Sequence, residues 1–215
     1  MRERVKRQYD NSRRLAQVRA TRLKVIDAAK SLFIEHGYPA TTLDSVADAA
    51  DVPLPTLYRL FKSKRALLSA VLDTSFGGDD EPVAFVDRDA VQRALSESDP
   101  RRMLEAFATI ATELLGRSSA IQQVLASAAQ VDAEAAGLLT EIRRQRHTGQ
   151  SRIIAALVDR GALDPGLEPS EAADLVYLLM SPDAYRILTI ERGWKPETFD
   201  KWLAHVLCRT LLAPE

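Results

Sequence analysis

The chain of 215 residues has a single cysteine, Cys208, and no long apolar run. One cysteine excludes a disulfide within the chain and is typical of proteins from a reducing compartment. No apolar run approaches the roughly 20 residues that a transmembrane helix requires. The N-terminus is also too basic and polar to hold the apolar segment of a signal peptide. We therefore expect a cytoplasmic protein that has no membrane partner.

The common catalytic motifs are absent as well. The chain has no G-x-x-x-x-G-K-[ST], no G-x-G-x-x-G, no G-x-S-x-G and no H-E-x-x-H. His36, His147 and His205 lie far apart in sequence, and one cysteine cannot complete a metal site with them. The sequence predicts no enzyme, no metal and no cofactor. A helical enzyme with an unrecognised site remains an alternative.

Charges of opposite sign are separated along the chain. Residues 1–75 contain 14 Lys/Arg against 8 Asp/Glu, which is a net charge of +6, and residues 76–215 contain 15 against 22, which is −7. Apolar residues make up 46% of the chain, enough for the core of one domain or of two small ones. A basic head on an acidic body is typical of a DNA-binding module joined to a part that does not bind DNA.

Residues 41–64, TTLDSVADAADVPLPTLYRLFKSK, predict two short helices around a tight turn. Thr42 is a suitable N-cap for a helix over residues 43–50, whose apolar positions fall on one face. Asp51 tolerates the left-handed conformation that a helix end often needs, and the residue before Pro53 is disfavoured in a helix. The first helix is therefore expected to stop at about residue 50.

The second helix begins at Leu54, with Pro55 in its first turn, where a missing N–H costs nothing. Its inward face is predicted to be Leu57, Leu60 and Phe61. The outward side chains are rich in hydroxyls and cations, the groups that contact phosphates and base edges. The predicted DNA-binding set is Thr42, Leu54, Pro55, Thr56, Tyr58, Arg59, Lys62 and Lys64. Within it, we expect Tyr58, Thr56 and Lys64 to hold phosphates and Leu54, Pro55 and Arg59 to lie near base edges.

The segment AAKSLFIEHGYPATTLDSVADAADVPLPTLYRLFKSKRALL resembles the signature of the TetR family of transcriptional regulators, and the resemblance extends over residues 22–72. The matching positions are Ala28-Ala29, Phe33, Gly37-Tyr38, Thr42, Val46-Ala47, Val52, Thr56-Leu57-Tyr58, Phe61, Ser63-Lys64 and Leu67. The resemblance implies a ligand-responsive repressor that binds palindromic double-stranded operator DNA as a homodimer. It also assigns Lys64 to the DNA backbone, where the alternative is a solvated surface lysine.

The segment departs from the family pattern at two positions. Asp51 replaces a glycine of the turn, and Pro53 replaces the serine that would cap the recognition helix. The lost cap is expected to weaken the first turn of that helix, which Pro55 partly offsets by restricting the unfolded chain. An architectural protein that binds DNA without an effector remains an alternative, because docking geometry does not reveal whether docking controls a gene.

The remaining chain predicts an all-α fold of about nine or ten helices. A first helix runs from a cap at Ser12 to about His36, after a basic arm at residues 1–11 that either reaches a minor groove or is a solvated tail. Ser63 caps a fourth helix, and the segment 77–82 separates domains at residues 1–76 and 83–215. The expected helices of the second domain cover residues 100–115, ended by Gly116, then 119–130 and 132–160, with later starts at Pro169, Pro182 and Pro196.

The second domain is expected to bind a small apolar effector and to form the dimer. Candidates for an apolar effector pocket are Met103, Phe107, Ile110, Leu114, Tyr177, Met180 and Tyr185, although such residues at helical spacing also make ordinary core. The last helix is apolar over about half its circumference, more than one core contact requires. This width favours a dimer contact through Leu179, Ile187, Phe199, Trp202, Leu203, Val206 and Leu207, and a larger core within one chain is the alternative.

Overall fold

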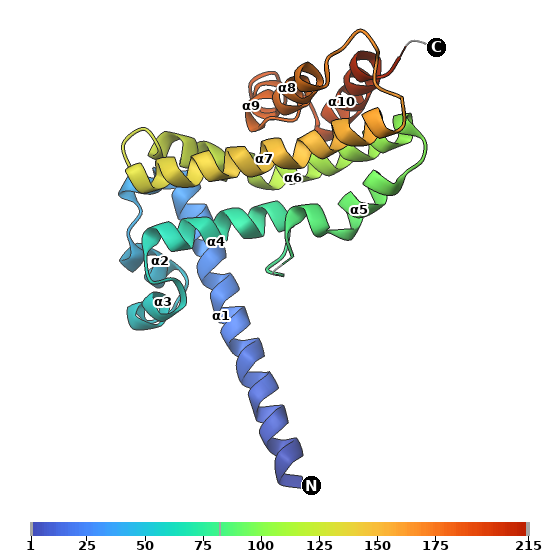
Figure 1. Cartoon of the computed structure of the whole chain (residues 1–215). Coiled ribbons are helices and arrows are strands. Elements are labelled where there is room, and N and C mark those ends of the chain that lie inside the picture. Colours follow the sequence, from blue (N-terminus) through green and yellow to red (C-terminus); the bar gives the residue numbers. More distant parts are fainter. Residues whose placement is uncertain (1, 82, 214–215) are drawn as a thin grey trace. The chain divides into compact units, whose positions relative to one another are not determined.

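The fold is built from helices, as the sequence predicts (Figure 1). The computed structural model describes residues 2–81 and 83–213, and side chains for residues 14–81 and 83–213. Extended pairing within this described part is limited to an isolated bridge between Leu163 and Leu212. In chain order the elements are α1 (Arg2–Ala40), α2 (Leu43–Ala49), α3 (Leu54–Phe61), α4 (Lys64–Gly77), η1 (Phe85–Asp87), α5 (Asp89–Ser96), α6 (Pro100–Ala128), α7 (Ala133–Asp159), α8 (Pro169–Leu179), α9 (Pro182–Arg186), η2 (Ile187–Glu191) and α10 (Pro196–Leu211).

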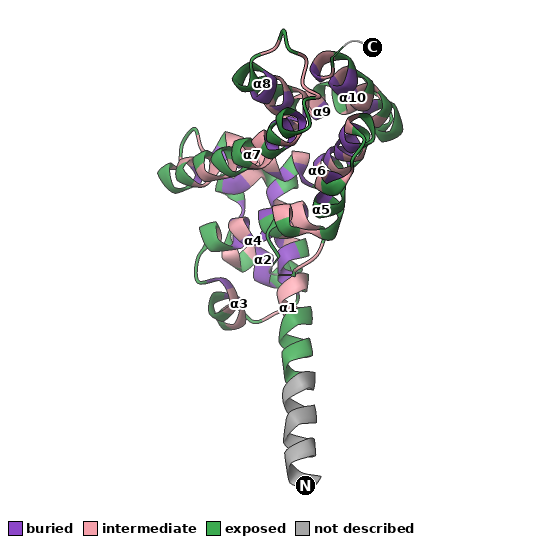
Figure 2. Cartoon of the chain, turned by 45° about the vertical axis from the view of Figure 1, so that its right-hand side comes forward, coloured by how far each residue is buried: buried purple, intermediate pink, exposed green. Residues whose placement is uncertain are grey.

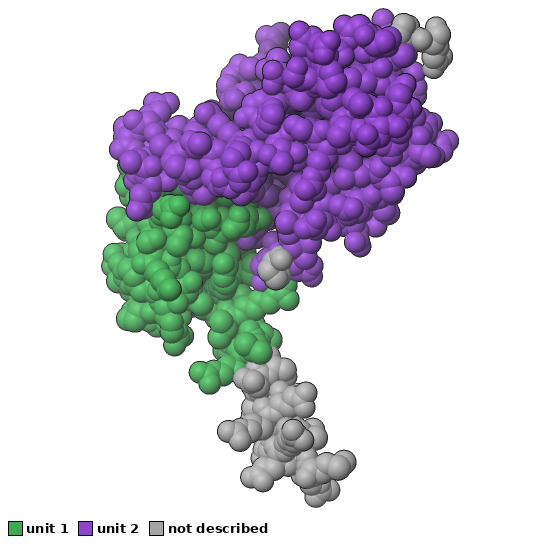
Figure 3. All heavy atoms as spheres, viewed as in Figure 1, with its two compact units in different colours: residues 1–73 green, residues 74–215 purple. Residues whose placement is uncertain are grey.

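The chain divides into two compact units, residues 1–73 and residues 74–215 (Figure 3). The division falls inside α4, so that helix begins in the first unit and ends in the second. Residues 77–82, where the sequence predicts a linker, lie in the second unit. The predicted start of the first helix at Ser12 is wrong, because α1 begins at Arg2 and includes most of the predicted basic arm at residues 1–11. The side chains of these residues lie outside the described part of the structure.

In the first unit, α1 packs against α2, and α2 packs against α3. The helical conformation of α1 is interrupted at Gly37, whose φ of 79° and ψ of 163° suit a residue without Cβ. The predicted end of the first helix near residue 36 is therefore confirmed. Buried side chains from all four helices form the core (Figure 2), namely Val25, Ile26, Ala29, Phe33, Val46, Leu57, Phe61, Leu67, Leu68, Val71 and Leu72.

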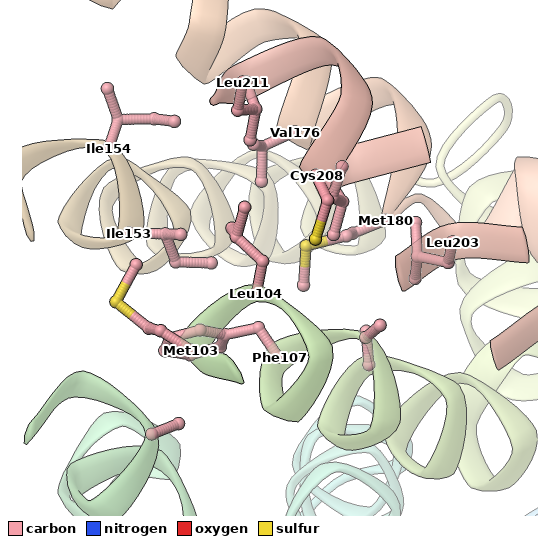
Figure 4. Packing of buried hydrophobic residues seen from close by; sticks show 14 of the residues in the cluster. Met103, Leu104, Phe107, Ile153, Ile154, Val176, Met180, Leu203, Cys208 and Leu211 are labelled. Atoms are coloured by element: carbon pink, nitrogen blue, oxygen red, sulfur yellow. The ribbon is translucent and has the colours of Figure 1, made fainter. Parts of the chain in front are cut away.

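In the second unit, α6 is the central helix and packs against α5, α7, α9 and α10. Its buried side chains recur at helical spacing and contribute to one hydrophobic cluster with α7, α8 and α10 (Figure 4). Each large apolar side chain that is fully buried contributes roughly 1.5–3 kcal/mol to folding. The cluster therefore holds these helices together as one body.

The prediction that Gly116 ends a helix is wrong, because α6 runs without interruption from Pro100 to Ala128. Glycine inside a helix costs about 1 kcal/mol relative to alanine, so another contact must account for it. A Cβ at Gly116 would lie 3.3 Å from the hydroxyl oxygen of Tyr185. The glycine thus gives room to Tyr185 rather than stopping the helix.

Several helix starts in the second unit follow the predicted capping pattern. Asp99 accepts from the N–H of Arg101 at 2.9 Å, and Asp132 accepts from the N–H of Ala135 at 2.8 Å. Ser181 accepts from the N–H of Ala184 at 3.0 Å. In contrast, α8 and α10 begin at prolines without a side-chain cap. Their starts depend on the fixed φ of proline instead.

The structure corrects part of the predicted dimer contact. Phe199, Leu203 and Leu207 are each 0% exposed and belong to the core of their own chain. A side chain that is already fully buried offers no surface to a second copy. Leu179, Trp202 and Val206 are half-buried, and Ile187 is 42% exposed, so these four residues keep surface that a partner could contact.

Candidate nucleic-acid interface

The first helix of the motif, α2, is fixed at its start by a reciprocal cap. The N–H of Ser45 donates to Oγ1 of Thr42 at 3.0 Å, and the N–H of Thr42 donates to Oγ of Ser45 at 3.2 Å. Two N–H groups that a helix start would leave unpaired are satisfied in this way. The predicted capping role of Thr42 is confirmed, whereas its role toward DNA stays a prediction.

The turn between α2 and α3 has the backbone that the sequence predicts. Asp51 adopts a positive φ of 51°, which ends α2. The N–H of Val52 then donates back to the carbonyl of Ala47 at 3.0 Å. Pro53 occupies the cap position of α3 without a side-chain hydrogen bond, as expected from the missing serine. Its carbonyl accepts from the N–H of Thr56 at 2.8 Å, which closes the first turn.

Helix α3 has one buried face and one face toward solvent. Leu57 is 0% exposed and Phe61 is 4% exposed, which anchors the helix in the first unit. Leu60, predicted to point inward, is half-buried. Tyr58 is 47% exposed, and Pro55 and Arg59 are exposed. The helix therefore presents an aromatic hydroxyl and a guanidinium to solvent from a rigid base.

Two further cations lie beside α3. Lys62 is exposed and has a positive φ of 55°, which ends the helix. Ser63 then accepts from the N–H of Ala66 at 3.1 Å, so its predicted capping role for α4 is confirmed. The guanidinium carbon of Arg22 lies 4.9 Å from the centre of the Phe61 ring. Arg22 thus supports the anchor of α3.

Lys64 has intramolecular contacts that sequence reasoning missed. Its ammonium donates to the carbonyl of Thr41 at 2.8 Å and to that of Pro39 at 3.3 Å. It also lies 4.4 Å from the centre of the Tyr38 ring. These contacts join the start of α4 to the segment between α1 and α2. No local spacing rule connects positions that are 25 residues apart, so the sequence carried no signal for them.

The predicted DNA-binding residues fall into two groups in the structure. Leu54, Pro55, Thr56, Tyr58 and Arg59 share α3, and Lys62 directly follows it. Thr42 and Lys64 instead occupy the starts of α2 and α4, and the hydrogen bond from Lys64 to Thr41 brings these two starts together. Such an arrangement, with a second short helix held on a first, can place one helix against the edges of base pairs and two helix starts against phosphates.

The residues predicted for an effector pocket are placed mainly in the core. Met103, Phe107, Met180 and Tyr185 are between 0% and 8% exposed and belong to the cluster of the second unit (Figure 4). Ile110 and Leu114 pack against that cluster. Tyr177 is half-buried and lies under the guanidinium of Arg146, 3.8 Å from its ring centre. Of these seven residues, Ile110 borders a hollow in the second unit.

Comparison with known proteins identifies this motif. Residues 25–71 match the family described as "Bacterial regulatory proteins, tetR family". Residues 25–71 therefore carry the DNA-binding region typical of TetR-family regulators. The matched residues run from α1 through the helix-turn-helix and into α4, and they include every predicted DNA-binding residue.

Several proteins with curated functions or solved structures resemble most of the chain. ComR of Escherichia coli K12, an HTH-type transcriptional repressor, is 26% identical over 158 residues, which are 70% of this chain and 71% of ComR. NalD of Pseudomonas aeruginosa, the secondary repressor of the MexAB-OprM multidrug efflux pump, has a TM-score of 0.66 at 23% identity and covers 91% of this chain and 98% of its own. FadR of Bacillus subtilis, solved with stearoyl-CoA, has a TM-score of 0.69 at 18% identity and covers 86% and 97%. These structural likenesses show that the second unit also shares its fold with these proteins.

Neither a metal centre nor a membrane segment is evident in the described part of the chain. The described residues include no group of three or more His, Cys, Asp or Glu side chains placed to hold a metal ion. Within the same residues, no helix is both long enough and apolar enough to cross a membrane.

Proposed function

We propose that the protein is a ligand-responsive transcriptional repressor that binds a palindromic operator as a homodimer. The main observation in support of this function is the geometry of α3. Its inner face is anchored by Leu57 and Phe61, while Tyr58 and Arg59 are exposed on the outside. A rigid helix with exposed polar side chains can enter a major groove without rearranging the unit that carries it.

The predicted DNA-binding residues divide into those that position the protein and those that read sequence. Thr56 and Tyr58 carry hydroxyls that can donate to phosphate oxygens, which set the register on the duplex. Arg59 carries a planar guanidinium, which matches the two acceptors of a guanine in the major groove. Leu54 and Pro55 begin α3 and offer apolar contact to a thymine methyl group. Lys62 adds an exposed cation next to this surface.

We expect a dimer because one α3 can read only a short site. A single recognition helix contacts only a few base pairs, so a second copy at the next major groove, about 34 Å away, is needed for specific binding. Because the two helices must match that spacing, a ligand that changes the geometry of the dimer would release DNA. DNA and ligand would then weaken each other's binding reciprocally. FadR of Bacillus subtilis, with its bound stearoyl-CoA, shows that a protein of similar fold holds a ligand.

An operator can be isolated by selecting bound duplexes from a random pool with the purified protein. We expect the selected sequences to converge on a palindrome with half-sites about one helical turn apart. Binding to that duplex, followed by fluorescence anisotropy, should be at least about a thousandfold tighter than binding to a scrambled duplex at physiological salt. Equal affinity for both duplexes would favour the architectural alternative.

The direction of regulation is tested in cells. A reporter fused to a promoter that carries the selected operator should be more active when the gene of this protein is deleted. Reporter activity that falls on deletion would contradict a repressor.

A further inference from the structure

A hollow in the second unit has the dimensions of a site for a small molecule. Its volume is about 400 Å³. It lies between Gly77 at the end of α4, the segment 85–91 and the side of α6 that carries Ile110, Glu113 and Arg117, and Glu81 and Val83 also border it. Phe85, Val91 and Ile110 give it an apolar wall, and Val91 is only 6% exposed. A hollow of this kind can accept an apolar ring.

The charged groups around the hollow are mostly carboxylates. Glu81, Asp87, Asp89 and Glu113 border it, together with Arg88 and Arg117, so its lining has a net charge of −2. Each carboxylate belongs to an exposed residue. A cation inside the hollow would therefore be attracted to its rim, and an anion of the same size would be repelled.

The two guanidinium groups do not offset this preference, because both already have acceptors. Arg88 donates from both terminal nitrogens to the carboxylate of Asp79, at 2.7 and 2.8 Å. Arg117 donates to the carbonyl of Phe76 at 3.3 Å. Within the described residues, however, Nε of Arg88 is buried and has no hydrogen-bond partner. Because this nitrogen has no accessible surface, a ligand oxygen would meet Arg88 at a terminal nitrogen instead. Each terminal nitrogen has two N–H groups and uses one toward Asp79, which leaves a donor on a residue that lines the hollow.

We propose that the hollow binds an organic cation that carries an apolar ring and an acceptor oxygen. The ring packs on Phe85, Val91 and Ile110, the positive charge lies near Glu113 and Asp89, and the oxygen accepts from Arg88. This ligand differs from the neutral apolar effector that the sequence suggests, and it lies at a different place from the residues first expected to bind one.

The end of α4 is positioned to respond to such a ligand. A Cβ at Gly77 would lie 2.4 Å from a terminal nitrogen of Arg88, so this guanidinium rests against the last residue of α4. The same helix begins at Lys64, beside the DNA-binding motif. A ligand that bonds Arg88 therefore lies beside the last turn of α4. This part of the inference rests on the proposed ligand-responsive function.

The probe for binding is benzoylcholine, which has a phenyl ring, a carbonyl oxygen and a quaternary ammonium group. Its control is 3,3-dimethylbutyl benzoate, in which a carbon atom replaces the charged nitrogen at nearly the same shape. Titration calorimetry on the full chain without DNA should detect saturable binding of benzoylcholine. The neutral analogue should bind about two- to fivefold more weakly, as expected for loss of partly exposed ionic contacts. Equal affinity for the two compounds, or no binding of benzoylcholine at millimolar concentration, would overturn the proposal.

Variants locate the site. Glu113→Gln and Asp89→Asn remove charge with little change of shape and should each weaken benzoylcholine about two- to fivefold. Glu105→Gln is the control, since Glu105 is an exposed residue of α6 that does not border the hollow. If the control weakens binding as much as Glu113→Gln, the ligand is held by the overall field and not by this hollow. DNA binding is measured separately on the selected operator, so failure of the repressor proposal and failure of this site give different results.

Discussion

The ammonium of Lys64 lies 4.4 Å from the centre of the Tyr38 ring while it donates to two backbone carbonyls between α1 and α2. The start of α4 is thereby tied to the segment that leads into α2. Each hydrogen bond contributes about 1 kcal/mol and the contact with the ring about 0.5–1 kcal/mol. In the first unit, Lys64 is therefore a residue that positions the motif, whatever it contributes to DNA binding.

Replacing Lys64 should destabilise the protein. We expect Lys64→Met to lower the free energy of unfolding of the first unit by about 1–3 kcal/mol, because it removes two hydrogen bonds and the contact with the Tyr38 ring. Hydrogen exchange of residues 38–45 and urea unfolding measure the effect. Lys62→Met is the matched control, since Lys62 is exposed and its change should leave stability within about 0.5 kcal/mol. Equal stability of the two variants would show that the Lys64 contacts do not hold the motif.

Arg59 and Tyr58 are expected to act on DNA in different ways. Arg59→Ala should make the free energy of operator binding less favourable by about 1–3 kcal/mol, and it should relax sequence preference at one position of each half-site. Tyr58→Phe keeps the ring and removes the hydroxyl, so it should weaken binding to all sequences about equally. Anisotropy titrations with the operator and with single-base variants separate these effects. Arg192→Ala removes an exposed cation from the second unit and is the control. If it relaxes sequence preference as Arg59→Ala does, the role of α3 is contradicted.

The elements that the sequence predicts well are those fixed by neighbouring residues. Thr42, Asp132 and Ser181 cap helices through N–H groups three residues later. The same locality explains the turn at Asp51. Boundaries of this kind depend on a few adjacent side chains and need no knowledge of the rest of the fold.

Contacts between distant residues could not be predicted in this way. In the sequence, Gly116 matches the pattern of a helix end. The reason for a glycine at this position is the space that Tyr185 occupies, and only the folded chain brings Tyr185 there. The sequence predicts the broad apolar surface of α10. The pattern alone, however, does not tell whether a second helix of the same chain or a helix of a partner packs on that surface. The structure assigns Phe199, Leu203 and Leu207 to the same chain. The hollow beside Arg88 likewise depends on segments that only folding brings together.

Cys208 should be unreactive in the folded protein. It is 6% exposed, and burial raises the pKa of its thiol. Because the thiolate is the nucleophile, both effects slow alkylation. At pH 8, iodoacetamide should modify the folded protein at least about tenfold more slowly than the protein in denaturing urea, as followed by mass spectrometry. Similar rates in the two conditions would show that the α6–α10 contact opens readily.

The last prediction concerns the surface through which two copies associate. Leu178 is 63% exposed on α8, and Ile190 is 73% exposed on η2. Large apolar side chains that remain exposed in one chain are candidates for contact with a second. With Ile187 and Leu179, they are accessible apolar residues, unlike the buried residues of α10. We therefore expect the isologous contact to involve α8 and η2.

Substitution by aspartate has different expected effects at these exposed residues and at the buried core residues. Leu207→Asp places an unpaired charge in the core and should lower the free energy of unfolding by at least about 3 kcal/mol, seen as loss of helical circular dichroism on mild heating. Leu178→Asp and Ile190→Asp combined should keep the circular dichroism of the wild type but sediment as a monomer at micromolar concentration. The monomer should lose operator binding, because both half-sites must be occupied. Val131→Asp is the control, since Val131 is 78% exposed elsewhere in the same unit and its change should leave a dimer. A double variant that still sediments as a dimer would exclude this surface as the contact.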